Sequence, residues 1–242
     1  MIAAFGDGPL TVLRRPAPVL GSVDLDGVVA AARTKPRGPV LLMSRCAPTA
    51  AFSRRDTLLP GYADAVRAAQ RAGFEAVIRP VGGHLAAYDT GALVLHLWGP
   101  HPEPRQGLRQ RFSIVANVMA EALKDLGIPD VRVGPVPGEY CDGEWSVNVG
   151  GRGKLVGTGQ RLFRSGFLFC AVVMVGPCEE VRNLLTDAYA RLGLPLDPAT
   201  VACADRWVPG IDPRHVGEVI SARLVEAVGA RAVSGSFPAA VS

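Results

Sequence analysis

The sequence predicts an α+β fold in which helices pack on a mixed, largely antiparallel sheet. Three observations support this prediction: short apolar runs are joined by turn residues as in hairpins, helical stretches fall between them, and 48% of the 242 residues are hydrophobic. A chain of this composition buries one large core. We expect a single domain over residues 1–233, followed by a frayed tail over residues 234–242.

The elements of the N-terminal half are assigned from residue spacing. Residues 10–13 and 39–43 are predicted strands, and residues 23–32 form a helix with Asp24 and Asp26 near its start. Residues 62–72 have helical spacing and end at Gly73. Residues 76–78 and the apolar run 92–98 are further strands, so the segment between them is a loop.

The C-terminal half begins with the longest amphipathic helix, over residues 106–126, which ends before Gly127. Short strands follow over residues 131–133, 145–149 and 154–158, with Gly150 and Gly151 as a hairpin turn. A strand over 166–175 precedes a helix over 179–192. A loop rich in Pro and Asp then leads to a last helix over 215–228.

Cysteine usage and hydropathy indicate the cellular compartment that suits the protein. The five cysteines include no CxxC pair, which argues against a zinc site and a disulfide framework and favours a reducing cytoplasm. The four histidines are too scattered for a metal site. No N-terminal signal sequence is evident, and no apolar stretch approaches the ~20 residues of a membrane helix. We therefore expect a cytoplasmic protein without membrane contact.

The charge pattern favours an acidic partner. The net charge is +4, and arginines gather at Arg54 and Arg55 and again at Arg105, Arg109 and Arg111. Aromatic residues make up only 6% and no recognition motif is present, which argues against nucleic-acid binding. Such a surface permits association with an acidic partner, although charged surface arginines are also ordinary for a soluble protein.

Two glycine-containing segments are typical of a ligand pocket. Lys154 stands in GRGKLVGTGQR, where its ammonium leaves a strand beside backbone that a ligand can approach closely. Such an ammonium holds a carboxylate, an acyl carbonyl or a phosphate. A phosphate loop of the form GxxxxGK[ST] does not fit, because Asn148 occupies the first glycine position and Leu155 replaces the hydroxyl. The second segment, RPVGGHLAAYDTG, offers Arg79 and main-chain amides before a strand.

Together the two segments resemble the motifs of the biotin/lipoate A/B protein ligase superfamily, in its lipoate-protein ligase and octanoyl-lipoyl transferase branch. The resemblance spans about residues 38–195 and implies that the catalytic domain of that family fills residues 1–233. It implies that Lys154 contacts the activated acyl carbonyl. It also implies a substrate-binding set of Arg79, Gly82, Gly83, His84, Tyr88, Asp89, Gly157, Thr158 and Gly159. In this set His84 replaces a glycine of the family pattern and Tyr88 replaces its histidine.

Cys141 is the candidate nucleophile. It precedes Lys154 by 13 residues in the segment PGEYCDG, which is similar to the cysteine-dependent octanoyl transferases of this superfamily. A nearby lysine or arginine lowers a thiol pKa, and Lys154 or Arg79 is placed to do so. The alternative is an ordinary loop cysteine. Cys178, at a helix start, is a weaker candidate. Cys170 in a buried strand and His96 between leucines are expected to be structural.

The function we expect is lipoate-metabolism acyl transfer, which moves an octanoyl or lipoyl group onto a lysine of a carrier through a thioester on Cys141. This acyltransferase requires no cofactor. One alternative is an ATP-dependent lipoate-protein ligase that acts through lipoyl-AMP, uses ATP and Mg, and leaves Cys141 a bystander. A second is a non-catalytic domain that binds acyl groups or carriers. The partners expected are an acidic lipoyl-domain or acyl carrier protein and its octanoyl or lipoyl group.

Overall fold

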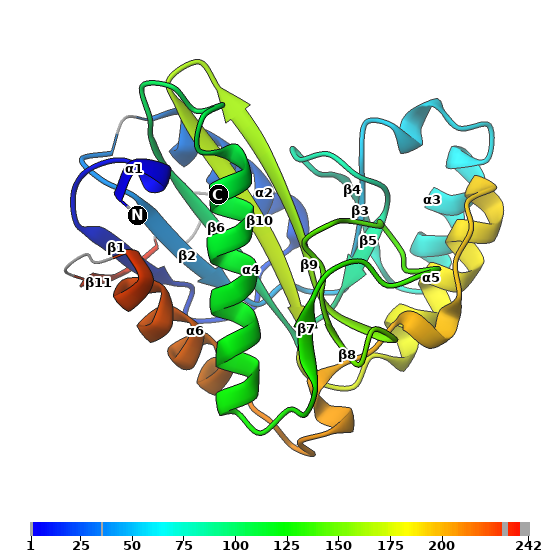
Figure 1. Ribbon diagram of the computed structural model, residues 1–242. Coiled ribbons are helices and arrows are strands. Elements are labelled where there is room, and N and C mark those ends of the chain that lie inside the picture. The colour runs from blue at the N-terminus through cyan, green and yellow to red at the C-terminus, as the bar shows by residue number, and fades with distance from the viewer. Residues whose placement is uncertain (1, 35, 229–231, 238–242) are drawn as a thin grey trace.

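A large mixed sheet forms the centre of the protein in the computed structural model, which describes residues 2–34, 36–228 and 232–237 (Figure 1). Its strand order is β11-β1-β2-β6-β10-β9-β8-β7. The strands are β1 (Leu10–Arg14), β2 (Val40–Ser44), β6 (Ala92–Pro100), β7 (Val131–Val133), β8 (Val147–Val149), β9 (Gly153–Phe163), β10 (Gly166–Met174) and β11 (Ala232–Ser236). Among the described strands of this sheet, β11-β1 and β1-β2 pair in parallel and the other pairs are antiparallel. The predicted α+β fold with a largely antiparallel sheet is confirmed.

A second, three-stranded sheet lies to one side of the main sheet (Figure 1). It has the order β4-β3-β5, formed by β4 (Glu75–Ile78), β3 (Thr49–Phe52) and β5 (Ala86–Tyr88). The helices α3 (Tyr62–Arg71) and α5 (Glu179–Leu192) pack against each other beside it. The sequence analysis missed β3 and β5 because both are short and rich in alanine, which has little preference for strands.

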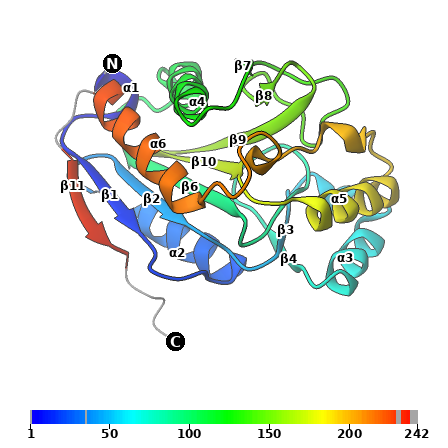
Figure 2. The ribbon, with the colours of Figure 1, turned by 90° about the horizontal axis from the view of Figure 1, so that it is seen from below.

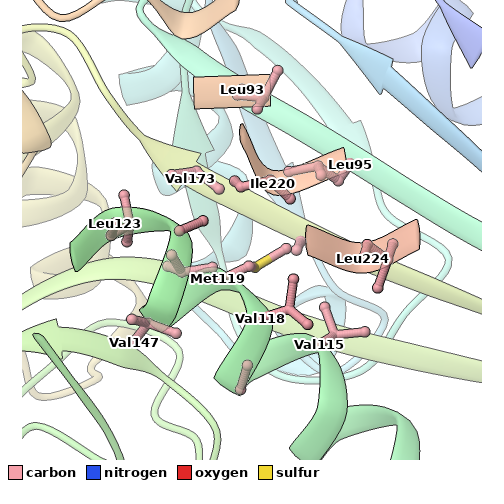
Figure 3. Close-up of a cluster of buried hydrophobic side chains, with 14 of the residues drawn as sticks. Leu93, Leu95, Val115, Val118, Met119, Leu123, Val147, Val173, Ile220 and Leu224 are labelled. Atoms are coloured by element: carbon pink, nitrogen blue, oxygen red, sulfur yellow. The ribbon is translucent and has the colours of Figure 1, made fainter. Parts of the chain in front are cut away.

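One face of the main sheet is covered by α4 (Leu108–Asp125) and α6 (Pro213–Val228), which Figure 2 shows lying along it. Side chains alternate along each strand, so Leu93 and Leu95 of β6 point to this face. They pack with Met119 of α4 and Ile220 of α6 (Figure 3). This apolar layer packs β6 and β10, on which the site described below is built, against the two helices.

The opposite face carries the alternate side chains of the same strands. Val94 and His96 of β6 lie there beside Cys170 and Val172 of β10, and all four line a cavity. The helix α2 (Gly21–Arg33) and the small sheet cover this face. The remaining helical segments are α1 (Ile2–Phe5) and three 3₁₀ turns over Asp56–Leu58, Pro198–Thr200 and Ala204–Arg206.

The chain end differs from the prediction of a frayed tail. Residues 232–236 form β11, whose five residues pair in parallel with β1, from Leu10 opposite Ala232 to Arg14 opposite Ser236. The pairing supplies partners for backbone groups of β1 that would otherwise lie at a sheet edge. Residues 238–242 lie outside the described residues. None of the helices in the described part of the chain has both the length and the apolar character needed to cross a membrane.

Candidate active site

The cavity lies between the small sheet and the face of the main sheet opposite α4 and α6. The main sheet supplies its wall from β6, β9 and β10, and β3 and β5 supply the facing wall. Its polar lining residues are Arg79, Tyr88, His96, Tyr140, Cys141, Lys154, Thr158 and Cys170. Most other lining residues are apolar, and they include Leu25 on α2 and Val81 in the loop after β4. An apolar channel with cations at one place suits an acyl chain with a reactive carbonyl.

Cys141 is held at this cavity by contacts to both its sulfur and its backbone. Arg79 Nη2 donates to Cys141 Sγ at 3.1 Å, and the backbone N–H of His84 donates to the same sulfur at 3.3 Å. Cys141 has a φ of +44°, a conformation that side chains rarely adopt. Its backbone N–H donates to the hydroxyl of Tyr189 at 2.7 Å, and that hydroxyl donates to Leu85 O at 2.8 Å. Tyr189 of α5 therefore fixes the loop of a strained cysteine.

These contacts determine the charge state of the thiol. Burial alone would raise the pKa of Cys141, but the positive charges of Arg79 and Lys154 and the hydrogen bonds from His84 and Arg79 outweigh burial. The pKa of Cys141 is consequently lowered from its ordinary value. A lowered pKa increases the thiolate, which is the nucleophilic form.

Two glycines of the predicted set are required by close contacts. Gly83 has a φ of +96°, and a Cβ at this residue would lie 2.5 Å from Cys141 Sγ and 2.6 Å from Arg79 Nη2. Only glycine allows the loop to approach the sulfur. Gly159 is the second, because a Cβ there would lie 2.9 Å from Val81 Cγ2 in the loop after β4.

Lys154 is buried, with a relative exposure of 1%, and its ammonium is occupied by the loop that carries the cysteine. Lys154 Nζ donates to Tyr140 O at 2.8 Å and to Cys141 O at 2.9 Å. It also forms an ion pair with Glu139 Oε2 at 3.0 Å. Glu139 Oε1 in turn accepts from the backbone N–H groups of Val136 and Gly143. The lysine therefore ties β9 to the segment 139–141.

Other residues of the predicted set have different positions. Tyr88, Thr158 and Gly159 line the cavity. The imidazole of His84 instead pairs with Asp56, at 2.7 Å between Nδ1 and Oδ1, so only its backbone faces the cysteine. Asp89 accepts from the N–H of Gly91 and shapes the turn without lining the cavity. Gly82 lines a neighbouring cavity.

The alternative cysteine and one arginine of the predicted basic cluster also lie differently from expectation. Cys178 is buried outside the cavity, and a hydrogen bond with Cys203, together with burial, raises its pKa, which makes a nucleophilic role unfavourable. Arg111 is fully buried, donating to Ala4 O and to Gln160, and is unavailable to a docking partner. Its burial follows from helical spacing, because Arg111 lies on the face of α4 that packs inward.

Sequence reasoning missed three residues that organise this site: Glu139, Tyr189 and Asp56. Glu139 stands two residues before Cys141 in the sequence and pairs with Lys154 in the structure. An acidic residue this near a candidate nucleophile was the signal that the sequence offered. Tyr189 and Asp56 gave no signal, because they reach the cysteine loop and His84 only through tertiary packing. Within the described residues, no three His, Cys, Asp or Glu side chains gather as metal ligands would.

Comparison with known sequences places the chain in a family. Residues 21–190 match the family model of the lipoyl protein ligase A/B catalytic domain. The octanoyl-GcvH:protein N-octanoyltransferase of Geobacillus kaustophilus is 28% identical over 145 residues, which cover 60% of this chain and 50% of that protein. The enzyme of the same name from Exiguobacterium sp. is 29% identical over 162 residues, or 65% and 56% of the two chains. The match thus spans about half the length of these relatives.

Solved structures with the same fold extend over nearly the whole chain. A T. acidophilum protein solved with bound lipoic acid has a TM-score of 0.75 at 16% identity, covering 96% of this chain and 90% of that one. A lipoate-protein ligase A bound with ATP has a TM-score of 0.71 at 16% identity, with the same two coverages. At these identities the structures establish the fold.

Proposed function

Because the chain belongs to the lipoyl protein ligase A/B catalytic-domain family, we propose that it transfers an octanoyl or lipoyl group onto a carrier-protein lysine through a thioester on Cys141. The observation that carries the proposal is the position of Cys141 Sγ. It accepts hydrogen bonds from a guanidinium and a backbone N–H at the lining of an apolar cavity, beside a second cation. The octanoyltransferase names of the relatives support the same chemistry.

In the first step the Cys141 thiolate attacks the carbonyl carbon of an acyl thioester, and the donor thiolate leaves. In the second step a neutral lysine amine attacks the Cys141 thioester, forms an amide, loses a proton and releases the cysteine. Both steps develop negative charge on the carbonyl oxygen. Arg79 Nε is buried and has no hydrogen-bond acceptor among the described residues, so it is an available donor for that oxygen.

The role of Lys154 in this mechanism is positioning. Its ammonium already has acceptors in Tyr140 O and Cys141 O and an ion-pair partner in Glu139, which leaves it poorly placed to donate to substrate as well. It holds the cysteine loop against β9, and its charge favours the thiolate. The resemblance alone had suggested direct contact with the acyl carbonyl.

The remaining site residues have supporting roles in this proposal. Tyr88, Thr158, Gly157 and Gly159 line the channel that receives the acyl chain. The backbone of Gly83 and His84 approaches the sulfur. Gly82 and Asp89 shape the loop that carries Arg79.

The donor and acceptor are carrier proteins with lipoyl domains, as the GcvH in the names of the relatives suggests. We propose that the carrier is acidic, because the chain carries a net charge of +4. We propose that the reaction takes place in the cytoplasm, because the five cysteines show no spacing typical of a disulfide framework. The reaction needs no cofactor. The ATP-dependent alternative is less favoured here, because Arg79 Nη2 and Lys154 Nζ are already engaged with protein acceptors.

The proposal is tested by intact-mass analysis of the protein after incubation with an octanoyl-loaded carrier. Wild-type protein and the control Cys178→Ser are expected to gain one octanoyl group that hydroxylamine removes. Cys141→Ser is expected to lose this intermediate and to slow transfer by about a hundredfold or more. Undiminished transfer by Cys141→Ser, or pyrophosphate release that requires ATP and free octanoate, would overturn the proposal.

A further inference from the structure

A second cysteine in the same cavity has the partners of an activated nucleophile. Cys170 Sγ lies 3.3 Å from His96 Nδ1, and His96 Nε2 lies 2.8 Å from Asp24 Oδ2. Cys170 and His96 both line the cavity, whereas Asp24 lies behind them on α2 with 1% exposure. A thiol, an imidazole and an orienting carboxylate in sequence form the arrangement that activates cysteine nucleophiles.

The fold brings Cys170, His96 and Asp24 together from segments that are distant in the sequence. Cys170 and His96 are directly opposite each other on β10 and β6, so strand pairing alone places sulfur beside imidazole. Asp24 is fixed by further donors, which include Ser44 Oγ at 2.8 Å and Arg15 Nε at 2.7 Å. An acid with this many donors cannot rotate away from the histidine.

The buried end of the cluster is positively charged. Burial would lower the pKa of His96, but the neighbouring Cys170 and Asp24 outweigh burial and raise it to about 10. His96 is therefore an imidazolium at neutral pH. Since Arg15 also pairs with Asp24, the buried group carries two positive charges and one negative charge. The proton on the imidazole ring therefore lies beside Cys170 Sγ, at 3.3 Å from the ring nitrogen Nδ1 to the sulfur.

The place of Cys170 in the cavity restricts what can react with it. Cys170 of β10 lies opposite Gly159 of β9. Gly157 lies two residues from Gly159 along the same strand, and Lys154 Cε lies close to Gly157. Two strand residues correspond to about 7 Å. A short alkyl spacer therefore separates Cys170 from the region of Lys154. An acyl group bound with its carbonyl at Cys141 would carry its tail toward Cys170, so the electrophile must be part of that tail.

We infer that Cys170, His96 and Asp24 form a second reactive site that exchanges with a cyclic disulfide at the end of the acyl chain. This inference rests on the proposed acyl transfer and assigns it an acyl class, namely chains that end in a dithiolane rather than a methyl group. A saturated chain offers the thiolate no electrophile. Neither cysteine would then be redundant, because Cys141 reacts with the carbonyl and Cys170 with the tail.

The exchange is balanced without an added oxidant or reductant. The Cys170 thiolate attacks one ring sulfur, a bond forms between Cys170 Sγ and that sulfur, and the ring S–S bond breaks. The second ring sulfur leaves as a thiolate and takes a proton from the His96 imidazolium. Reversal closes the ring and frees Cys170. The acyl group is thus tethered while it is bound and is released unchanged.

The test uses wild-type protein incubated with lipoamide and then quenched with N-ethylmaleimide, which caps the freed ring thiol before the ring closes again. Non-reducing mass spectrometry with peptide mapping is expected to show a lipoamide adduct on the peptide that contains Cys170, which dithiothreitol removes. Cys170→Ser is expected to lack this adduct. Absence of an adduct on Cys170 in the wild-type protein would overturn the inference.

Two variants separate an activated thiol from an accessible one. His96→Gln keeps the sulfur and is expected to slow adduct formation by about tenfold or more. Cys46→Ser is the matched control, because Cys46 also contacts Asp24, at 3.8 Å, but does not line the cavity, and burial raises its pKa. An equal rate in His96→Gln would overturn the inference. Octanoyl transfer through Cys141 involves no disulfide, so the Cys141→Ser experiment fails or succeeds independently.

Discussion

Arg79 is the residue whose charge most directly controls Cys141. Its guanidinium donates to the sulfur and lowers the thiol pKa, and thiolate is therefore present at lower pH than for an ordinary cysteine. Alkylation of Cys141 by iodoacetamide is expected to rise with pH around a midpoint below the ~8.5 of a free thiol. Arg79→Gln removes the charge and is expected to move that midpoint upward.

Peptide mapping of alkylated Cys141 over a pH series measures the midpoint. Arg71→Gln is the control, because it removes the same charge from the exposed end of α3 without touching the cysteine. The midpoint of the control should equal that of the wild type. An unchanged midpoint in Arg79→Gln would show that this guanidinium does not activate the thiol.

The buried pair of Lys154 and Glu139 gives a second prediction at the scale of single residues. Lys154→Met leaves the Glu139 carboxylate buried without its cation, which is expected to lower the free energy of unfolding by about 3–5 kcal/mol. Lys154→Met with Glu139→Gln removes both charges and is expected to recover part of that loss. Urea unfolding measures both effects.

The same variants separate the structural role of Lys154 from its electrostatic role. The alkylation midpoint of Cys141 is expected to stay raised in the double variant, because the positive charge is still missing. A midpoint that returns to the wild-type value together with stability would mean that Lys154 acts only by holding the loop.

The site residues that could be predicted from the sequence are those marked by local spacing. Lys154, Arg79 and Gly83 stand in glycine-rich segments, where close backbone approach is visible in the chain itself. The partnership of Cys170 with His96 was not predicted, because alternation along a strand does not show which residue lies opposite on the next strand. Both had been expected to be structural core residues.

At the scale of elements, the contact of α3 with α5 depends on one small residue. A Cβ at Gly61, directly before α3, would lie 1.7 Å from the carbonyl oxygen of Arg191 near the end of α5. Gly61→Ala must therefore push the two helices apart. We expect it to lower the free energy of unfolding by about 1–3 kcal/mol, as measured by urea denaturation.

Gly143→Ala is the matched control for this effect. The nearest atom to a Cβ at Gly143 is Ser146 Oγ at 3.9 Å, and its backbone is not in the left-handed region. The control is expected to unfold at the wild-type urea concentration or slightly above it, because alanine restricts the unfolded chain. If Gly61→Ala were as stable as the control, the close approach of the two helices would not exist in solution.

Elements with strong periodicity or paired turns were predictable, whereas the short, alanine-rich strands β3 and β5 were not. The helix over 179–192 has the predicted bounds, and the hairpin at Gly150 and Gly151 joins β8 to β9 as expected. The strand β9 continues to Phe163, five residues beyond the prediction, because its pairing with the long β10 extends it. Tertiary pairing, which local spacing does not encode, set the length.

At the scale of the molecule, the two sheets place the reactive groups beside a cavity lined by arginines. A second cavity shares Arg79, Pro80 and Val81 with the lining of the first and is also lined by Arg54, Arg55 and Arg161, which are exposed. The basic residues Arg54 and Arg55, expected from the sequence to favour an acidic partner, therefore lie next to the cysteine site. Arg109 lies elsewhere and pairs with Glu144 at 2.6 Å.

This arrangement predicts that carrier recognition depends on salt. Raising ionic strength from about 0.01 to 0.15 M shortens the screening length from about 30 to 8 Å, so the KM for an acidic carrier should rise with little change in kcat.

The double variant Arg54→Glu with Arg55→Glu is expected to raise that KM by about tenfold at low salt and to weaken its salt dependence. Arg214→Glu, an exposed arginine at the start of α6 and outside this cavity, controls for the change in net charge. The single variant Arg55→Glu changes the net charge by the same amount as Arg214→Glu. If the two raised KM equally, the total charge of the protein, and not the arginines of this cavity, would attract the carrier.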